Sequence, residues 1–311
     1  MDSLTFVLLN SNISIFTFFV NIFLVFCMIF PQQGTDRLKQ PLNVLLGTIV
    51  GCNITLQICI FLYIIIALCS SRHMVFVVAV EILFFSMRTS VTSSLWLNVF
   101  YYCQIVPTQH SVFIYLKKNI RFFIYTSLIA EKIFFIFGLC ENIAANALFD
   151  KYFNTYNYTT QLHETETKLD TVTFLAMLDI WISCSYTLLC LIVMTTSSCA
   201  TIFYLRKHMK SMQGSSSTIS SPRLQRQMRV TVTGIIQTIL FFLCSVWILM
   251  RELLALVFKL YVDLNGHICC SVVCLYTFGS TINLCVGQTI FRQQVVGIWQ
   301  KFVKAANLLF K

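Results

Sequence analysis

The side chains that could carry out chemistry are few in this 311-residue chain, and their spacing forms no catalytic or metal site. The five histidines lie at the ends of apolar stretches or in the connections between them. The sequence has no paired-histidine zinc motif, no phosphate-binding glycine loop and no nucleophile elbow. Most of the fourteen cysteines fall inside apolar stretches, where they serve as small packing residues. We therefore expect no enzyme activity, no metal and no cofactor.

Charged side chains inside apolar stretches are the strongest functional signal, because each is costly in lipid unless it faces protein or water. Glu81 and Arg88 are seven residues apart, which places them on one face of a helix. We interpret these two residues and Arg251 as lining a cavity, the alternatives being an interfacial position or structural pairing. The charges within the stretches are Glu81, Arg88, Glu131, Lys132, Asp179, Arg251 and Glu252.

Seven long apolar stretches must position these charges, and each exceeds the roughly 20 residues that a membrane-spanning helix needs. Backbone polar groups must be paired inside lipid, so the stretches are predicted to be helices. Charged residues make up only 11% of the chain, against roughly a quarter in soluble domains. The sequence thus predicts an all-α membrane protein, a seven-helix bundle. The stretches cover residues 6–30, 42–69, 74–105, 122–143, 172–204, 230–258 and 267–291.

The net charge of +10 is distributed unevenly over the connections, which argues for membrane topology rather than nucleic-acid binding. Most lysines and arginines lie in alternate connections and in the tail, and by the positive-inside rule this set is cytoplasmic. We therefore expect a multi-pass plasma-membrane protein with an extracellular amino terminus, a cytoplasmic carboxyl terminus and attraction to anionic lipid. The opposite connections hold Arg72, Lys151, Lys168 and Lys259.

An amphipathic tail follows the last apolar stretch. Apolar residues from Val295 to Leu309 recur at helical spacing, with Lys301 and Lys304 between them. This pattern is typical of a helix that lies on the membrane surface. We divide the chain into a seven-helix domain, residues 1–293, and a cytoplasmic tail helix, residues 294–311.

A glycosylation sequon, Asn157-Tyr158-Thr159, lies in the polar connection of residues 142–171. This connection is on the outer side in the predicted topology, where glycans are attached. The sequence therefore predicts a glycan on Asn157.

Seven spans with an outer amino terminus indicate a G-protein-coupled receptor. The chain lacks several marks of the rhodopsin-like class. The third span ends in Phe100-Tyr101-Tyr102 rather than Asp-Arg-Tyr. The sixth span has no Cys-Trp-x-Pro, and the seventh has no Asn-Pro pair.

Four motifs, in order along the chain, resemble the type 2 bitter taste receptor family. Leu97-Asn98-Val99-Phe100-Tyr101 is similar to its Leu-Ser-Val-Phe-Tyr, and Phe113-Ile114-Tyr115-Leu116-Lys117 to its Phe-Leu-x-Leu-Lys. His208-Met209-Lys210-Ser211-Met212 carries its His-x-Lys-x-Met pattern. Gly287-Gln288-Thr289-Ile290-Phe291-Arg292-Gln293 is similar to its exit from the last span. The chain departs from the family at Asn53, Cys190 and Ser280-Thr281, as in a divergent member.

The resemblance implies a chemosensory receptor that binds small-molecule bitter agonists in an outward cavity and activates a heterotrimeric G protein of the taste, inhibitory type. A vomeronasal type 1-like pheromone receptor is the related alternative, which the His-x-Lys-x-Met exit disfavours. A channel or transporter is the alternative from another class. It would need a polar route across the whole membrane, whereas the span charges gather in the outer half.

We transfer the family's ligand pocket to this chain by position and add Glu81 from the charge pattern. The resulting wall is mostly apolar and can repack around many ligand shapes. The ligand-binding candidates are Val80, Glu81, Leu83, Phe84, Met87, Arg88, Ile180, Ser183, Tyr186, Trp247, Met250, Arg251, Cys270, Val273 and Cys274. The candidates for G-protein coupling are Tyr101, Lys117, His208, Lys210 and Arg229.

Overall fold

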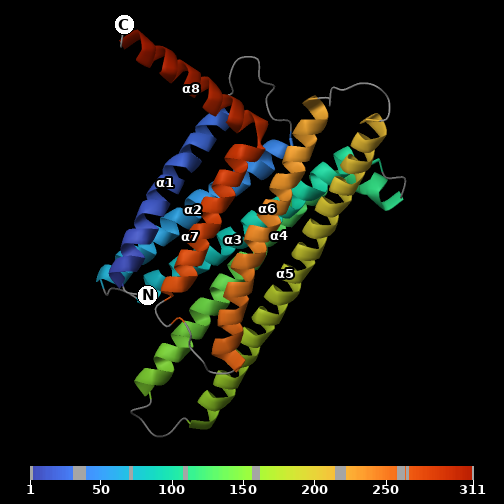
Figure 1. Cartoon of the computed structure of the whole chain (residues 1–311). Helices are drawn as coiled ribbons and strands as arrows, with labels where there is room; N and C mark the ends of the chain where they lie inside the picture. Colours follow the sequence, from blue (N-terminus) through green and yellow to red (C-terminus); the bar gives the residue numbers. More distant parts are fainter. Residues whose placement is uncertain are drawn as a thin grey trace.

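The computed structural model describes residues 3–30, 40–69, 73–107, 111–155, 162–213, 222–257, 263 and 266–309. These residues form eight α-helices and no strand. Helices α1 to α7 form an elongated bundle, and α8 extends across one end of it (Figure 1). The helices are α1 (Ser3–Ile29), α2 (Leu42–Cys69), α3 (His73–Ile105), α4 (Ser111–Thr155), α5 (Leu162–Gln213), α6 (Pro222–Val257), α7 (His267–Gly287) and α8 (Thr289–Leu309).

Six of the described helices are long and apolar enough to cross a membrane: α1, α2, α4, α5, α6 and α7. The predicted third span, α3, is less apolar because it lies inside the bundle, where it contacts α2, α4, α5 and α6. Its hydroxyl side chains therefore face protein rather than lipid. The buried hydroxyl residues of α3 are Ser86, Thr89, Ser90, Thr92, Ser93 and Ser94.

Helices α1, α4, α5 and α6 surround this centre and expose large apolar side chains. Helix α4 is the most peripheral, since only 6% of its most apolar segment is buried within the bundle. Phe134 and Phe137 on α4 are 66% and 69% exposed, and Phe203 on α5 is 71% exposed. Such surfaces are stable in lipid, where apolar side chains and internally paired backbone are both required.

Two helices run further than the apolar pattern predicted. The expected connection of residues 142–171 is partly helical, because α4 continues to Thr155 and α5 begins at Leu162. Residues 141–155 and 162–171 contain neither glycine nor proline, so nothing ends the helix where the lipid ends. Inside α4, Asn119 has a non-helical backbone (φ −108°, ψ 16°), which separates a short first segment from the long one.

The last predicted span is interrupted before its expected end at residue 291. Helix α7 ends at Gly287, Gln288 is extended (φ −88°, ψ 124°), and α8 begins at Thr289. The Phe291 side chain is fully buried against a cluster that includes Leu24 and Leu284. Gln294 Nε2 donates to the Phe30 carbonyl oxygen at 2.9 Å. These contacts fix the predicted tail helix to the end of α1.

Candidate ligand site

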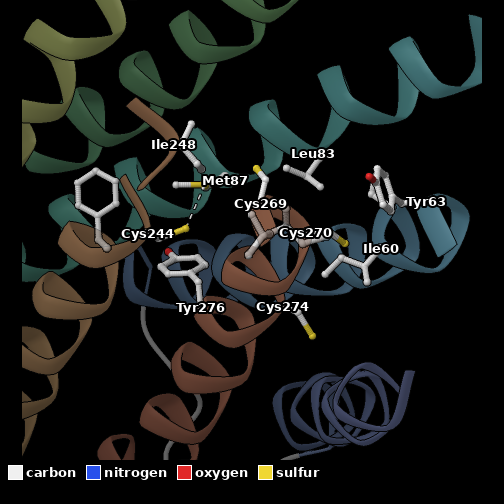
Figure 2. Packing of buried hydrophobic residues seen from close by; sticks show 14 of the residues in the cluster. Ile60, Tyr63, Leu83, Met87, Cys244, Ile248, Cys269, Cys270, Cys274 and Tyr276 are labelled. Atoms are coloured by element: carbon white, nitrogen blue, oxygen red, sulfur yellow. Dashed lines mark hydrogen bonds between the residues drawn. The ribbon is translucent and has the colours of Figure 1, made fainter. Parts of the chain in front are cut away.

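Five residues of the candidate wall, on α3 and α7, lie in one buried apolar cluster. Leu83, Met87, Cys270, Val273 and Cys274 all belong to it. Figure 2 shows the side chains of α3, α6 and α7 meeting here, with the Cys244 thiol of α6 facing Met87. The Cys244 Sγ to Met87 Sδ distance is 3.9 Å. The phenyl ring of Phe84 and the phenol of Tyr186 pack against the cluster.

A polar network borders this cluster and joins three helices. Arg88 Nη2 donates to Ser183 Oγ at 3.1 Å, which links α3 to α5. One turn along α3, Thr92 Oγ1 donates to Glu131 Oε1 of α4 at 2.8 Å. The Tyr186 hydroxyl of α5 is also hydrogen-bonded to Thr92. The half-buried Glu131 carboxylate therefore has a hydroxyl donor.

The α6 candidates point in different directions. Trp247 is half-buried, and its Nε1 is fully buried with no hydrogen-bond acceptor within the protein. Met250, by contrast, is 53% exposed and continues the exposed row of Leu243 and Val246. The structure therefore does not bring Met250 together with the cluster. The remaining candidates, all half-buried, are Val80, Glu81, Ile180 and Arg251.

Polar side chains along α7 bind it to four other helices, a feature that sequence analysis missed. Asn21 Nδ2 of α1 donates to Thr281 Oγ1 at 2.9 Å. Gln237 Nε2 of α6 donates to Ser280 Oγ at 3.1 Å and to the Tyr276 hydroxyl at 3.3 Å. Interhelical hydrogen bonds of this kind hold membrane bundles together where lipid provides no hydrophobic drive. Further bonds to α7 come from Asn10, Asn53, Gln57 and Ser90.

The coupling candidates lie at the opposite end of the bundle, where α3 and α5 end and α4 and α6 begin (Figure 1). Lys117, His208 and Lys210 are exposed, and the His208 ring is tilted against Tyr204 at a centroid distance of 6.2 Å. Two of the coupling candidates, Tyr101 and Arg229, are less accessible. Tyr101 donates to Gln288 Oε1 at 3.3 Å, and Arg229 is half-buried.

The sequon residue Asn157 lies outside the described residues.

The geometry defines a class of protein: a helical membrane bundle with an apolar cluster bordered by polar groups at one end and exposed basic residues at the other. This arrangement is that of a membrane receptor. A profile of the family described as taste receptor protein (TAS2R) matches residues 2–303. The chain therefore belongs to the taste receptor family, which confirms the resemblance found in the sequence. A search of curated proteins found no match.

Family membership makes the chain a chemosensory receptor of the G-protein-coupled type. It also confirms the prediction that the chain is not an enzyme, because the family is one of receptors.

Proposed function

We propose that the chain is a bitter taste receptor that binds small-molecule agonists between α3, α5, α6 and α7. The observation that carries this proposal is the half-buried Arg88 guanidinium, bonded to Ser183 beside a buried apolar cluster. Small-molecule sites combine an apolar wall with a few convergent polar groups in this way. Val273 and Cys274 are fully buried, so a ligand reaches them only when the surrounding helices separate.

Agonist binding acts through a population shift. The agonist binds the active arrangement of the helices more tightly, and this difference in affinity sets how far the equilibrium moves. The exposed basic end of the bundle then contacts a heterotrimeric G protein of the taste, inhibitory type. In this proposal the receptor lies in the plasma membrane with its amino terminus outside, and α8 rests on anionic lipid.

The Trp247 indole is the second polar anchor for an agonist. Its N–H group is buried without an acceptor, so an agonist with a carbonyl or ether oxygen supplies the missing partner. Trp247→Phe keeps an aromatic ring but removes the donor. We expect a potency loss of roughly tenfold for acceptor-bearing agonists, in line with one lost hydrogen bond.

Met250→Leu is the matched control, because Met250 lies on the exposed face of the same helix. Dose–response curves for both variants measure the effect. A larger loss for Met250→Leu than for Trp247→Phe would show that the other face of α6 lines the site.

His208→Ala tests the coupling end. His208 is exposed just before the end of α5, beside the exposed Lys210. We expect agonist-stimulated nucleotide exchange on purified G protein to fall about threefold, because one contact at the rim of the receptor–G-protein interface is lost. Agonist affinity should stay the same. Thr196→Ala, exposed in the middle of α5, is the control. Equal exchange rates for His208→Ala and the unmodified receptor would remove His208 from the coupling surface.

Asn157→Gln tests the predicted topology. The sequon at Asn157 accepts a glycan only if its connection is extracellular. We expect glycosidase treatment to increase the gel mobility of the unmodified receptor and to leave Asn157→Gln unchanged. No shift for the unmodified receptor would contradict either the orientation or the use of this site.

A calcium-mobilisation screen tests the function as a whole. Cells that express the receptor with a promiscuous G protein are exposed to a panel of bitter compounds. We expect dose-dependent responses that are absent from cells with the empty vector. Silence toward bitter compounds with responses to pheromone-type volatiles would favour the vomeronasal-like alternative. Agonist-dependent ion flux in reconstituted vesicles without G protein would instead indicate a channel.

A further inference from the structure

A small cavity lies within the bundle, nearer the coupling end than the proposed ligand site. Its volume is about 20 Å³, and α2, α3, α6 and α7 surround it. Its walls contain amide and hydroxyl groups as well as apolar side chains. The lining residues that matter for its chemistry are Ile49, Asn98, Gly234, Gln237, Asn283 and Leu284.

Asn98 lines this cavity and has an unpartnered amide nitrogen. The residue is only 8% exposed, and its Nδ2 has no hydrogen-bond acceptor within the protein. A buried donor without an acceptor costs about 1–3 kcal/mol. Gly234 makes room for the amide, because a Cβ atom at that position would lie 2.2 Å from Asn98 Oδ1.

Gln237 also lines the cavity and offers an acceptor. Both protons of its Nε2 are engaged, with Tyr276 and Ser280. Its Oε1 accepts one hydrogen bond, from Asn283 Nδ2 at 3.3 Å. A carbonyl oxygen has two lone pairs, so Gln237 Oε1 retains one. A small molecule in the cavity therefore accepts from Asn98 and donates to Gln237.

The chemistry of the walls selects the occupant. The lining contains no lysine, arginine, histidine, aspartate or glutamate, so an ion of either sign lacks a countercharge. A cation also offers no acceptor to the Asn98 N–H group. Water both accepts and donates, and it needs at least about 10–15 Å³ with two or more polar partners. We infer that this cavity binds one ordered water molecule, which links Asn98 of α3 to Gln237 of α6.

This site joins α3 to α6. A bridging water is nearly as favourable as a direct hydrogen bond. Gln237 in turn is bonded to Tyr276, Ser280 and Asn283 of α7. The water therefore adds a second link from α3 to this network, beside the hydrogen bond between Ser90 and the Tyr276 hydroxyl.

Radiolytic labelling of the purified full-length receptor tests this inference. Ile49 and Leu284 line the cavity and are 1% and 5% exposed, so hydroxyl radicals reach them only from water inside the protein. Ile60, which is 0% exposed and does not line the cavity, is the internal reference. We expect Ile49 and Leu284 to be oxidised several times faster than Ile60. Equal rates at the three positions would overturn the inference.

Two variants remove the site in different ways. Asn98→Leu replaces the amide by an apolar group of similar size, and Gly234→Ala forces the amide out of its position. Each is expected to lower the labelling of Ile49 to the Ile60 rate. Ser93→Ala is the control, since Ser93 is buried with an unpartnered hydroxyl on α3 but does not line the cavity. Ser93→Ala should leave the labelling of Ile49 unchanged. Persistent labelling of Ile49 in both cavity variants would also overturn the inference. If neither variant folds, the labelling of Ile49 and Leu284 relative to Ile60 in the unmodified receptor decides whether the cavity holds water.

Discussion

Arg88→Ala is expected to lower agonist potency by at least tenfold while the receptor still reaches the cell surface. The Arg88 guanidinium is half-buried, and its Nη2 lies 3.1 Å from Ser183 Oγ beside the apolar cluster. A hydrogen bond to a charged group contributes about 1.5–3 kcal/mol, and 1.4 kcal/mol corresponds to a tenfold change in affinity. Alanine removes both the charge and the donors that hold α3 to α5 at the edge of the site.

Three further variants separate the possible causes. Arg88→Lys keeps the charge but loses the planar fork, so it should restore only part of the potency. Ser183→Ala removes only the neutral partner and should have a smaller effect. Lys132→Ala removes an exposed cation from α4 and controls for charge loss alone. Calcium responses normalised to surface staining provide the measurement. Unchanged half-maximal concentrations for several chemically distinct agonists would exclude Arg88 from the site.

The positions of the helices could be predicted because lipid imposes a simple rule on sequence. The predicted second span, residues 42–69, coincides with α2, and the predicted start of the seventh coincides with that of α7. A short polar connection follows α2, so the change in hydropathy and the end of that helix fall together. At α4 and α5 the change in hydropathy and the end of the helix lie at different residues. Residues such as Ala144, Ala147 and Glu166 favour a helix without favouring lipid.

Which wall candidates lie together was predictable only where family resemblance supplied the rotation of each helix. Leu83, Met87 and Cys270, assigned by position, share one buried cluster, and their role in ligand binding stays a prediction. Apolar residues surround most of α2, so periodicity alone does not say which face of that helix points inward. Met250 was assigned to the wall by position and lies on the exposed face of α6.

The polar bonds of α7 were beyond sequence analysis for a related reason. Gln237 and Asn283 are 46 residues apart, and each looks like an isolated polar residue in an apolar stretch. Their pairing depends on how α6 and α7 are rotated and offset relative to each other. The usable signal was the clustering of Thr277, Ser280 and Thr281 on α7, since polar groups inside lipid require partners.

Gly287→Ala is expected to produce the largest loss of stability, because α6 and α7 meet closely at that residue. A Cβ atom at position 287 would lie 2.2 Å from Thr233 Cγ2 and 2.8 Å from Thr233 Cβ. Thr233 does not move aside easily. Its Oγ1 donates to the Val230 carbonyl oxygen at 2.7 Å, and its own carbonyl oxygen accepts from Asn283 Nδ2 at 2.8 Å.

The added methyl group must therefore push the two helices apart, and overpacking of this kind costs about 1–3 kcal/mol. We expect the melting temperature of the detergent-solubilised receptor to fall by about 3–8 °C. Gly51→Ala is the matched control, because a Cβ atom there meets nothing within 4 Å. Alanine is also the better helix former, so this control should melt at the same temperature or slightly higher. Thr233→Ser in the Gly287→Ala background removes the nearest atom and should recover part of the loss. Equal melting temperatures for Gly287→Ala and Gly51→Ala would contradict the close contact of α6 and α7 at this point.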